Sequence, residues 1–154
     1  MQTPNEWLQR LVGEWTWEMD ASEPDGTPMK VSASESVRLL GNVWALCEGR
    51  DGNDKESGST LMTLGFDPEK GRFQGTFIGV MMTHIWIYDG QLDASGNLLT
   101  LDTEGPSYEQ EGTMARYQDT IEFRSDDHRV LTSRFLGADG QWKHFMTAHY
   151  RRTG

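Results

Sequence analysis

Apolar and polar residues alternate along most of the chain, and glycine or Asp/Asn turns interrupt the alternation at short intervals. Residues two apart point to the same face of a strand, so this pattern predicts half-buried β-strands. Every connection is short enough for an antiparallel neighbour, and none holds a crossover helix. About ten strands are predicted, over residues 14–22, 29–40, 43–50, 59–66, 72–80, 84–92, 98–105, 112–124, 129–136 and 141–151.

Helical spacing occurs in one segment, PNEWLQRLVG, close to the N-terminus. Its apolar residues fall on one stripe, Thr3 precedes Pro4 as an N-terminal cap, and Gly13 ends the pattern. The sequence therefore predicts a single short helix over residues 3–12.

An up-and-down meander of about ten strands must either close on itself or expose long edges. We therefore predict an all-β fold, an antiparallel up-and-down β-barrel, as one domain over residues 1–154. Connections at one end are mostly long (SEPDGTP, DGNDKESG, VMM and GPSYEQEG), and those at the other end are compact. The helix should close the compact end as a plug, so the open mouth should carry Met81 and Met82.

Pairing through the turns predicts which side chains face the interior, because the side-chain period of a strand is two. In the middle strands the aromatic face is taken as the inside. Its predicted members include Phe73, Phe77, His84, Trp86, Tyr88, Asp102, Glu104, Tyr117 and Asp119. The inward set predicted for the outer strands includes Trp15, Trp17, Glu35, Trp44, Glu48, Trp142, His144, Met146 and Tyr150. At SDDHR the register is open, and either Arg134 or Phe135 faces in.

Two sets of residues resemble known families. GEW at 13–15 and the terminal HYRRTG resemble the lipocalin-like (calycin) barrels, in which this tryptophan packs near an Arg or Lys of the last strand. The predicted topology places Trp15 and Arg151 or Arg152 at the same closed end. The combination of EWLQRLVGEW, MMTHIWIYDGQLD, LTLDTEGPS, GTMARYQDTIEF, DHRVLTS and FMTAHYRR resembles an uncharacterised bacterial family, the domain of unknown function numbered 1579. That resemblance implies a calycin-like barrel and carries over no activity or catalytic residue.

Charge and composition restrict the partners. The net charge of −10 opposes sequence-independent binding to nucleic acid or to an anionic membrane. The chain has no run of about 18 apolar residues, and MQTPNEWLQR lacks the features of a signal peptide, so we expect a soluble cytoplasmic protein. The lone Cys47 cannot form an internal disulfide, which fits a reducing compartment.

The acids on the predicted inner face indicate a hollow, wet interior, because burying an unpaired carboxylate is costly. Aromatic walls would supply apolar contact area for a small, partly apolar ligand, and the acids favour a neutral or cationic polar group on it. Buried hydrogen-bond networks in a filled barrel are the alternative. The predicted ligand-binding residues are His84, Trp86, Tyr88, Asp102, Glu104, Tyr117, Phe77, Trp44, Glu35, Glu48, His144 and Met82.

Other functions stay open at this point. His84 with Glu104 or Asp102 could act as an enzymatic acid/base pair, or with His144 as ligands of a divalent metal. The segment HFMTAHYRR is similar to the last strand of nitrobindin-type haem barrels, and this resemblance would make His144 a haem ligand. The methionine-bearing mouth could also form a homodimer surface. Without a compact metal motif, we expect no resident cofactor and no catalytic residue.

Overall fold

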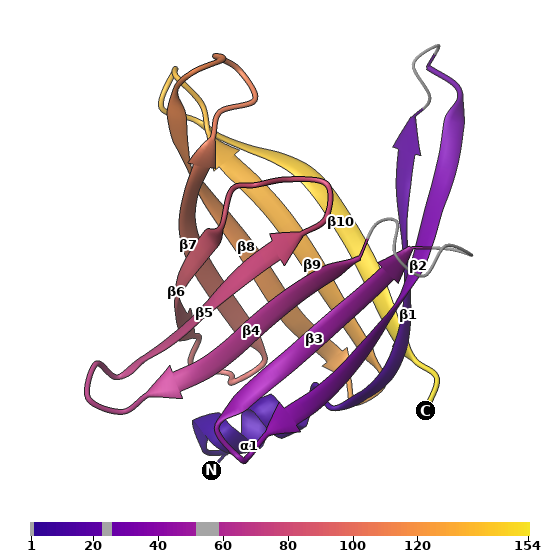
Figure 1. Cartoon of the computed structure of the whole chain (residues 1–154), viewed down its shortest axis with the longest axis vertical. Coiled ribbons are helices and arrows are strands. Elements are labelled where there is room, and N and C mark those ends of the chain that lie inside the picture. Colours follow the sequence, from indigo (N-terminus) through magenta and orange to yellow (C-terminus); the bar gives the residue numbers. More distant parts are fainter. Residues whose placement is uncertain (1, 23–25, 52–58) are drawn as a thin grey trace.

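A closed antiparallel β-barrel forms most of the molecule, in a computed structural model that describes residues 2–22, 26–51 and 59–154 (Figure 1). Each strand pairs with its neighbours in sequence, and the first strand also pairs with the last. The strands are β1 (Gly13–Ser22), β2 (Pro28–Leu40), β3 (Trp44–Asp51), β4 (Thr60–Asp67), β5 (Arg72–Gly79), β6 (Trp86–Leu92), β7 (Leu98–Pro106), β8 (Met114–Ser125), β9 (His128–Leu136) and β10 (Trp142–Arg152). The predicted up-and-down barrel is confirmed. Of two predicted open-end connections, residues 23–25 of SEPDGTP and 52–58 of DGNDKESG lie outside the described residues.

A short helix, α1 (Pro4–Gln9), precedes the barrel and lies at one end of it (Figure 1). The Thr3 side-chain oxygen accepts a hydrogen bond from the main-chain N–H of Glu6 at 3.1 Å, which satisfies one free donor of the first turn. The helix is shorter than the predicted range 3–12, because the following amides bond to carbonyls three residues back and tighten the chain. No helix in the described parts of the chain is long and apolar enough to cross a membrane.

The apolar side of α1 and the residues just after it fill the base of the barrel. Trp7 and Leu8 of the helix, and Leu11 beyond its end, are at most 1% exposed. The Trp7 ring lies edge-on to the rings of Phe73 and Phe123, with centroids 5.7 and 5.6 Å away. The predicted plug at this end is therefore present, and any interior space must lie above this layer.

Arg152, near the end of β10, joins the first strand, the last strand and the chain after α1. Its guanidinium lies over the Trp15 ring, 4.3 Å from the ring centroid. It also donates hydrogen bonds to the main-chain oxygens of Arg10 and Val12, at 2.8 and 2.5 Å. The tryptophan–arginine pair expected at the closed end is confirmed, with Arg152 rather than Arg151 as the partner.

Strand β3 presents the opposite face from the one predicted. The turn before it holds three residues, with Gly41 at φ +61°, so that Leu40 pairs with Trp44 rather than with Val43. A shift of one residue moves every side chain of a strand to the other face. The predicted inward positions Trp44 and Glu48 are therefore wrong. The buried residues of β3 are Ala45, Cys47 and Gly49.

Strand β7 also presents the opposite face from the one predicted, again because the turn before it shifts the register by one residue. Leu92 pairs with Leu99, so six residues rather than five lie between the last paired residues of β6 and β7. The Asp93 carboxylate holds this longer turn, accepting hydrogen bonds from the Ser95 hydroxyl and from main-chain amides within it. The prediction that Asp102 and Glu104 face inward is wrong. The buried residues of β7 are Leu99, Leu101, Thr103 and Gly105.

A β-bulge between His144 and Met146 changes the face of β10 part-way along the strand. Before the bulge, His144 pairs with Arg134 on the outer face, and after it Met146 faces the interior. The predicted inward positions of His144 and Trp142 are therefore wrong, whereas Met146 was placed correctly. Of Arg134 and Phe135, between which the sequence left the inward position open, Phe135 faces the interior. The Arg134 guanidinium lies outside, 4.6 Å from the centroid of the Trp142 ring.

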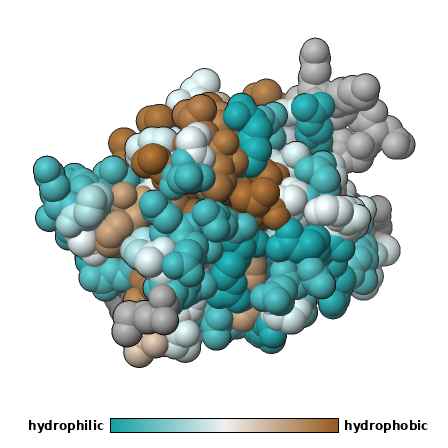
Figure 2. Space-filling view, turned by 90° about the horizontal axis from the view of Figure 1, so that it is seen from below, coloured by the Kyte–Doolittle hydropathy of each residue, from teal (hydrophilic) through white to brown (hydrophobic). Residues whose placement is uncertain are grey.

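The outer surface is mainly polar. Seen from the end that carries α1, hydrophilic side chains dominate, with one gathering of apolar ones (Figure 2). Exposed apolar residues include Ile78, Ile85 and Ile87, whose neighbours Phe77 and Trp86 face the interior. The alternation predicted for β5 and β6 is thereby confirmed from Phe73 to Phe77 and from Trp86 to Tyr88. The inward position predicted for His84 is wrong, because the strand begins only at Trp86 and His84 lines an outer hollow.

The contacts of Arg152 predict a specific loss of stability. Arg152→Ala should lower the free energy of unfolding by about 2–3 kcal/mol, because it removes charged hydrogen bonds and a cation–π contact. Arg151→Ala, an exposed neighbour on the same strand, should change it by less than about 0.5 kcal/mol. Chemical denaturation of both variants measures the difference, and equal losses would contradict this account of barrel closure.

Candidate ligand-binding site

Above the helix the barrel encloses two adjoining lobes. Lobe A, about 270 Å³, is lined from β1 to β5 and from β9 and β10; lobe B, about 250 Å³, is lined mainly from β5 to β10. Five side chains line both lobes: Met62, Phe77, Met81, Leu131 and Met146. The lobes therefore form one interior site, whose combined size reaches the range of about 300–1,000 Å³ usual for small-molecule pockets.

Aromatic rings and methionines make up much of the wall. In lobe A the rings of Trp17 and Tyr150 lie 5.9 Å apart, and in lobe B Trp86 meets Tyr117 edge-on at 4.9 Å. The flexible methionines on the shared wall can adapt to different ligand shapes. The lining thus offers apolar contact with some tolerance of shape.

A buried ion pair lies beside lobe A. The Arg129 guanidinium donates to the Glu35 carboxylate, and the two side chains are only 4% and 12% exposed. Arg129 also lies over the rings of Trp15 and Tyr150, at 4.6 and 4.1 Å from their centroids. Glu35, a predicted site residue, does line lobe A, but its charge is neutralised.

Lobe B holds a different polar group, the carboxyl of Asp119. One of its oxygens accepts a hydrogen bond from the Ser133 hydroxyl at 2.7 Å, and the other from the Tyr88 hydroxyl at 2.5 Å. Burial raises the pKa of Asp119, and these two donors only partly offset the rise. Burial also raises the pKa of Tyr88 well above its ordinary value, and the negative charge of Asp119 adds to the effect.

Two further groups border the lobes. Thr103, in the wall of lobe B, has a buried hydroxyl with no hydrogen-bond partner among the described residues. Cys47 faces lobe A, although the sequence analysis did not place it in the site. Burial raises the pKa of its thiol, and the nearby Glu35 raises it further, so the thiol stays protonated and is a poor nucleophile at neutral pH.

The mouth lies at the end opposite α1. Met81, 62% exposed, reaches both lobes, as expected for a lip of the pocket. Met82 lines lobe B, and its sulfur accepts a hydrogen bond from the Trp86 indole N–H at 3.3 Å. Tyr108 packs edge-on against Phe145 at 5.1 Å and covers part of the opening.

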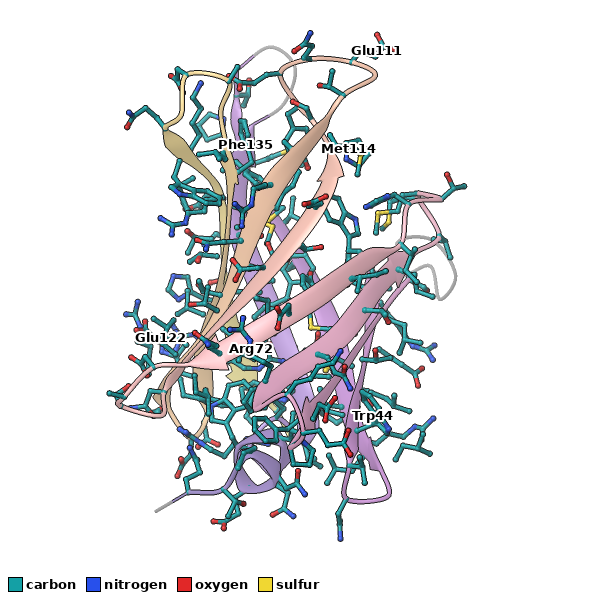
Figure 3. The ribbon with its side chains drawn as sticks, turned by 90° about the vertical axis from the view of Figure 1, so that its left-hand side faces the viewer. Trp44, Arg72, Glu111, Met114, Glu122 and Phe135 are labelled. Carbon is teal, nitrogen blue, oxygen red and sulfur yellow. The ribbon has the colours of Figure 1, made fainter. Side chains whose placement is uncertain are left out.

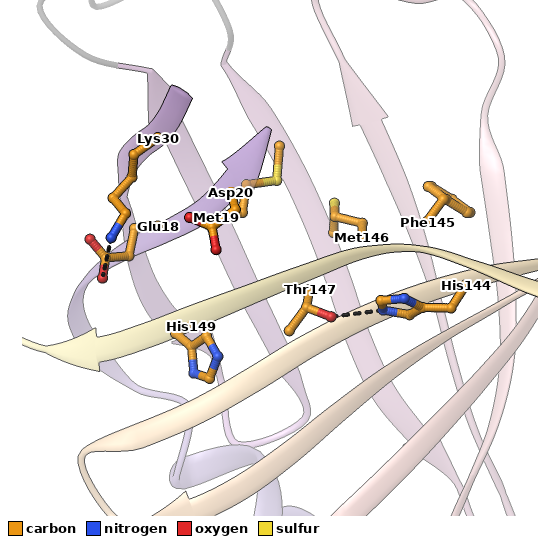
Figure 4. A pocket seen from close by; sticks show the side chains of 9 residues that line it. All are labelled: Glu18, Met19, Asp20, Lys30, His144, Phe145, Met146, Thr147 and His149. Atoms are coloured by element: carbon orange, nitrogen blue, oxygen red, sulfur yellow. Dashed lines mark hydrogen bonds and ion pairs between the residues drawn. The ribbon is translucent and has the colours of Figure 1, made fainter. Parts of the chain in front are cut away.

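The barrel wall is incomplete between β1 and β10. In the described residues these strands pair only from Trp15 with Arg152 to Glu18 with His149, although both strands continue beyond that point. A hollow of about 410 Å³ occupies the gap, with Met19 and Met146 across it (Figure 4). Met19 also lines lobe A, and Met146 lines both lobes, so the outer hollow adjoins the interior at these two side chains.

Half of the predicted site residues line the interior. They are Phe77, Met82, Trp86, Tyr88 and Tyr117 in lobe B, with Phe77 also in lobe A, and Glu35 in lobe A. All of them belong to strands or connections whose faces were predicted correctly.

The other half lie outside. His84 precedes β6 and lines an outer hollow together with Asp102 and Glu104. Its Nε2 bonds to the main-chain oxygen of Glu104 at 2.9 Å rather than to a carboxylate. Glu48 lies near Arg38 and Arg50 on the surface. Trp44 lines another outer hollow, together with Lys70 and Arg72, toward the helix end of the barrel (Figure 3). His144 bonds to Thr147 at 2.7 Å beside the gap.

The geometry also bears on the metal and haem alternatives. Among the described residues, no three His, Cys, Asp or Glu side chains gather as metal ligands. His144 lines the outer hollow and neither interior lobe, so it is not directed at a group bound inside the barrel.

Several interior residues were missed by the sequence analysis as ligand contacts. Ser133 and Leu131 lie on the same face of β9 as Phe135, so fixing that one register would have found them. Met62 lines both lobes from β4, but an apolar side chain on a strand does not by itself indicate a ligand contact. Phe145 lines lobe B because the bulge between His144 and Met146 interrupts the alternation of β10. The sequence pattern does not predict this bulge.

Comparisons with known proteins agree with this architecture. The crystal structure of Rv2717c from M. tuberculosis superposes with a TM-score of 0.64 at 14% identity, covering 100% of both chains. The structure of the S-type phycobiliprotein lyase CPES from Guillardia theta gives a TM-score of 0.55 at 18% identity, covering 97% of this chain and 92% of that one. No curated protein matches in sequence. At these identities the two structures establish the fold alone.

The protein is thus a calycin-like β-barrel with a hollow, largely apolar interior. It belongs to the family described as "Protein of unknown function (DUF1579)", which matches residues 1–152. The family membership inferred from the sequence motifs is confirmed.

The raised pKa of Asp119 predicts a stability difference that depends on pH. Wild-type protein should lose stability through this group as the pH rises from about 3.9, where the unfolded chain ionises, through the higher folded-state pKa. Asp119→Asn removes that loss while leaving an amide in reach of Tyr88 and Ser133. The free energy of unfolding of the variant minus that of wild type should therefore be larger at pH 7 than at pH 3.5. Denaturation curves at both pH values measure this, and a pH-independent difference would contradict it.

Proposed function

We propose that the barrel binds a small, partly apolar organic molecule in its interior. The observation that carries the proposal is the pair of lobes joined by Met62, Phe77, Met81, Leu131 and Met146. Pockets for small molecules are usually concave and mostly apolar, with a few polar groups that fix orientation. The lobes have that character, since the polar side chains facing lobe B are few and concentrated around Asp119.

A binding role accounts for the interior better than the acid/base alternative. His84, Asp102 and Glu104 meet on the outer surface, and the imidazole bonds to a main-chain oxygen there. That hollow is lined largely by exposed residues, so it shields a reaction poorly from water. The interior supplies shielding and apolar contact but lacks the histidine.

Filling the interior should therefore abolish binding. Ala33 lines lobe A, whereas its neighbour Ser34 is exposed on the outer face of β2. Ala33→Trp should weaken binding of the neutral fluorescent probe N-phenyl-1-naphthylamine at least tenfold, about 1.4 kcal/mol, by occupying its space. Ser34→Trp, the matched control, should leave the affinity within about twofold.

Probe fluorescence titrated against each protein gives the affinities, and far-UV circular dichroism verifies that both variants fold. The proposal fails if wild type does not bind the probe. It fails equally if Ala33→Trp and Ser34→Trp bind alike, since the probe would then sit elsewhere.

A further inference from the structure

Asp119 is a half-buried carboxyl group for which the described residues supply no cation as a direct partner. Both of its hydrogen-bond partners, Tyr88 and Ser133, are neutral hydroxyls. Arg129, the buried arginine of this barrel, already pairs with Glu35. A carboxylate can accept about four hydrogen bonds, so two acceptor positions of Asp119 remain unused by these contacts.

The surroundings of Asp119 are suited to a cation and unsuited to an anion. Among the described residues that line lobe B there is no lysine or arginine. The rings of Trp86, Tyr88 and Tyr117 line the same lobe, and the faces of such rings attract organic cations. The net charge of −10 further raises the local concentration of cations around the protein.

We propose that the ligand of this barrel carries a protonated amine that binds the Asp119 carboxylate in lobe B. This inference rests on the proposed function, because it assumes that a molecule occupies the interior. The ammonium group donates hydrogen bonds to the free acceptor positions of Asp119. The apolar body of the ligand extends along the shared wall of Met62, Phe77 and Leu131 into lobe A.

Three alternatives for the polar group are less favourable. A carboxylate or phosphate would face Asp119 with no cation in the lining of lobe B to hold it. A neutral hydroxyl could donate to Asp119 but would leave its buried charge uncompensated. An ammonium group donates and compensates together, although its own desolvation limits the net gain.

Binding of the amine depends on the ionisation of Asp119. The groups that face Asp119 are Tyr88 from β6, Ser133 from β9 and, further away, Tyr150 from β10, whose pKa burial also raises. Neither tyrosine titrates below neutral pH, so Asp119 controls this range. As the pH falls through its raised pKa, Asp119 becomes neutral and the affinity for the amine should fall.

The test compares three ligands of one shape: 4-phenylbutylamine, 4-phenylbutanol and 4-phenylbutyrate. Isothermal titration calorimetry at pH 7 should show the amine binding wild-type protein at least tenfold more tightly than the alcohol, and the carboxylate binding most weakly. Asp119→Asn should remove the preference for the amine while changing the affinity for the alcohol less than about threefold. Glu104→Gln, which changes an exposed carboxylate outside the barrel, should leave all three affinities unchanged.

Equal binding of the amine and the alcohol to wild type overturns the inference, as does an amine preference that survives in Asp119→Asn. If that variant does not fold, the pH dependence of wild type decides. Amine affinity should then fall as the pH is lowered through the raised pKa of Asp119 while alcohol affinity stays constant, and parallel behaviour of the two ligands overturns the inference.

The failure of this inference is distinguishable from failure of the proposed function. If N-phenyl-1-naphthylamine binds in an Ala33-dependent way but the amine has no advantage, only the inference is lost. If neither the probe nor any phenylbutyl compound binds, both are lost.

Discussion

Closure of the ring between its first and last strands is the constraint on which the other features depend. It is achieved over four residue pairs, and Arg152 reinforces it by lying over Trp15 and bonding to the carbonyls that follow α1. With this end held, the helix can seal the base while the opposite half of the barrel stays hollow. Because Trp7 packs against Phe73 and Phe123 and fills this end, the interior space lies above that layer.

The sequence predicts the strands, the helix and the closed barrel well, because alternation and turn residues act locally. It fails where the face of a strand depends on the length of the preceding turn. In β3 both faces are apolar, since Trp44 and Leu46 compete with Ala45 and Cys47, so the pattern cannot reveal a turn one residue longer. The run of leucine and threonine in β7 hides the same shift.

The one-residue register shifts in β3 and β7 change which polar groups face the interior, but the interior cavity itself remains. Turning β3 and β7 over removes Glu48, Asp102 and Glu104 from the interior and leaves it far less acidic than the sequence indicated. Of the inner acids first expected, Glu35 is neutralised by Arg129 and Asp119 is not. A single carboxyl group among aromatic rings and methionines is a more selective feature than a ring of acids, because one contact then decides which polar group is accepted.

The gap between β1 and β10 has a consequence for the behaviour of the protein in concentrated solution. A closed barrel normally hides its main-chain donors and acceptors, but here two strand edges stay open above the last pair, and open edges invite pairing with other chains. Asp20 places a charge on one of these edges, and the bulge between His144 and Met146 disrupts the regular pairing of the other strand. A charge and a bulge are both features that oppose the docking of a second strand, so the open edges of this barrel are poorly suited to pairing with another chain.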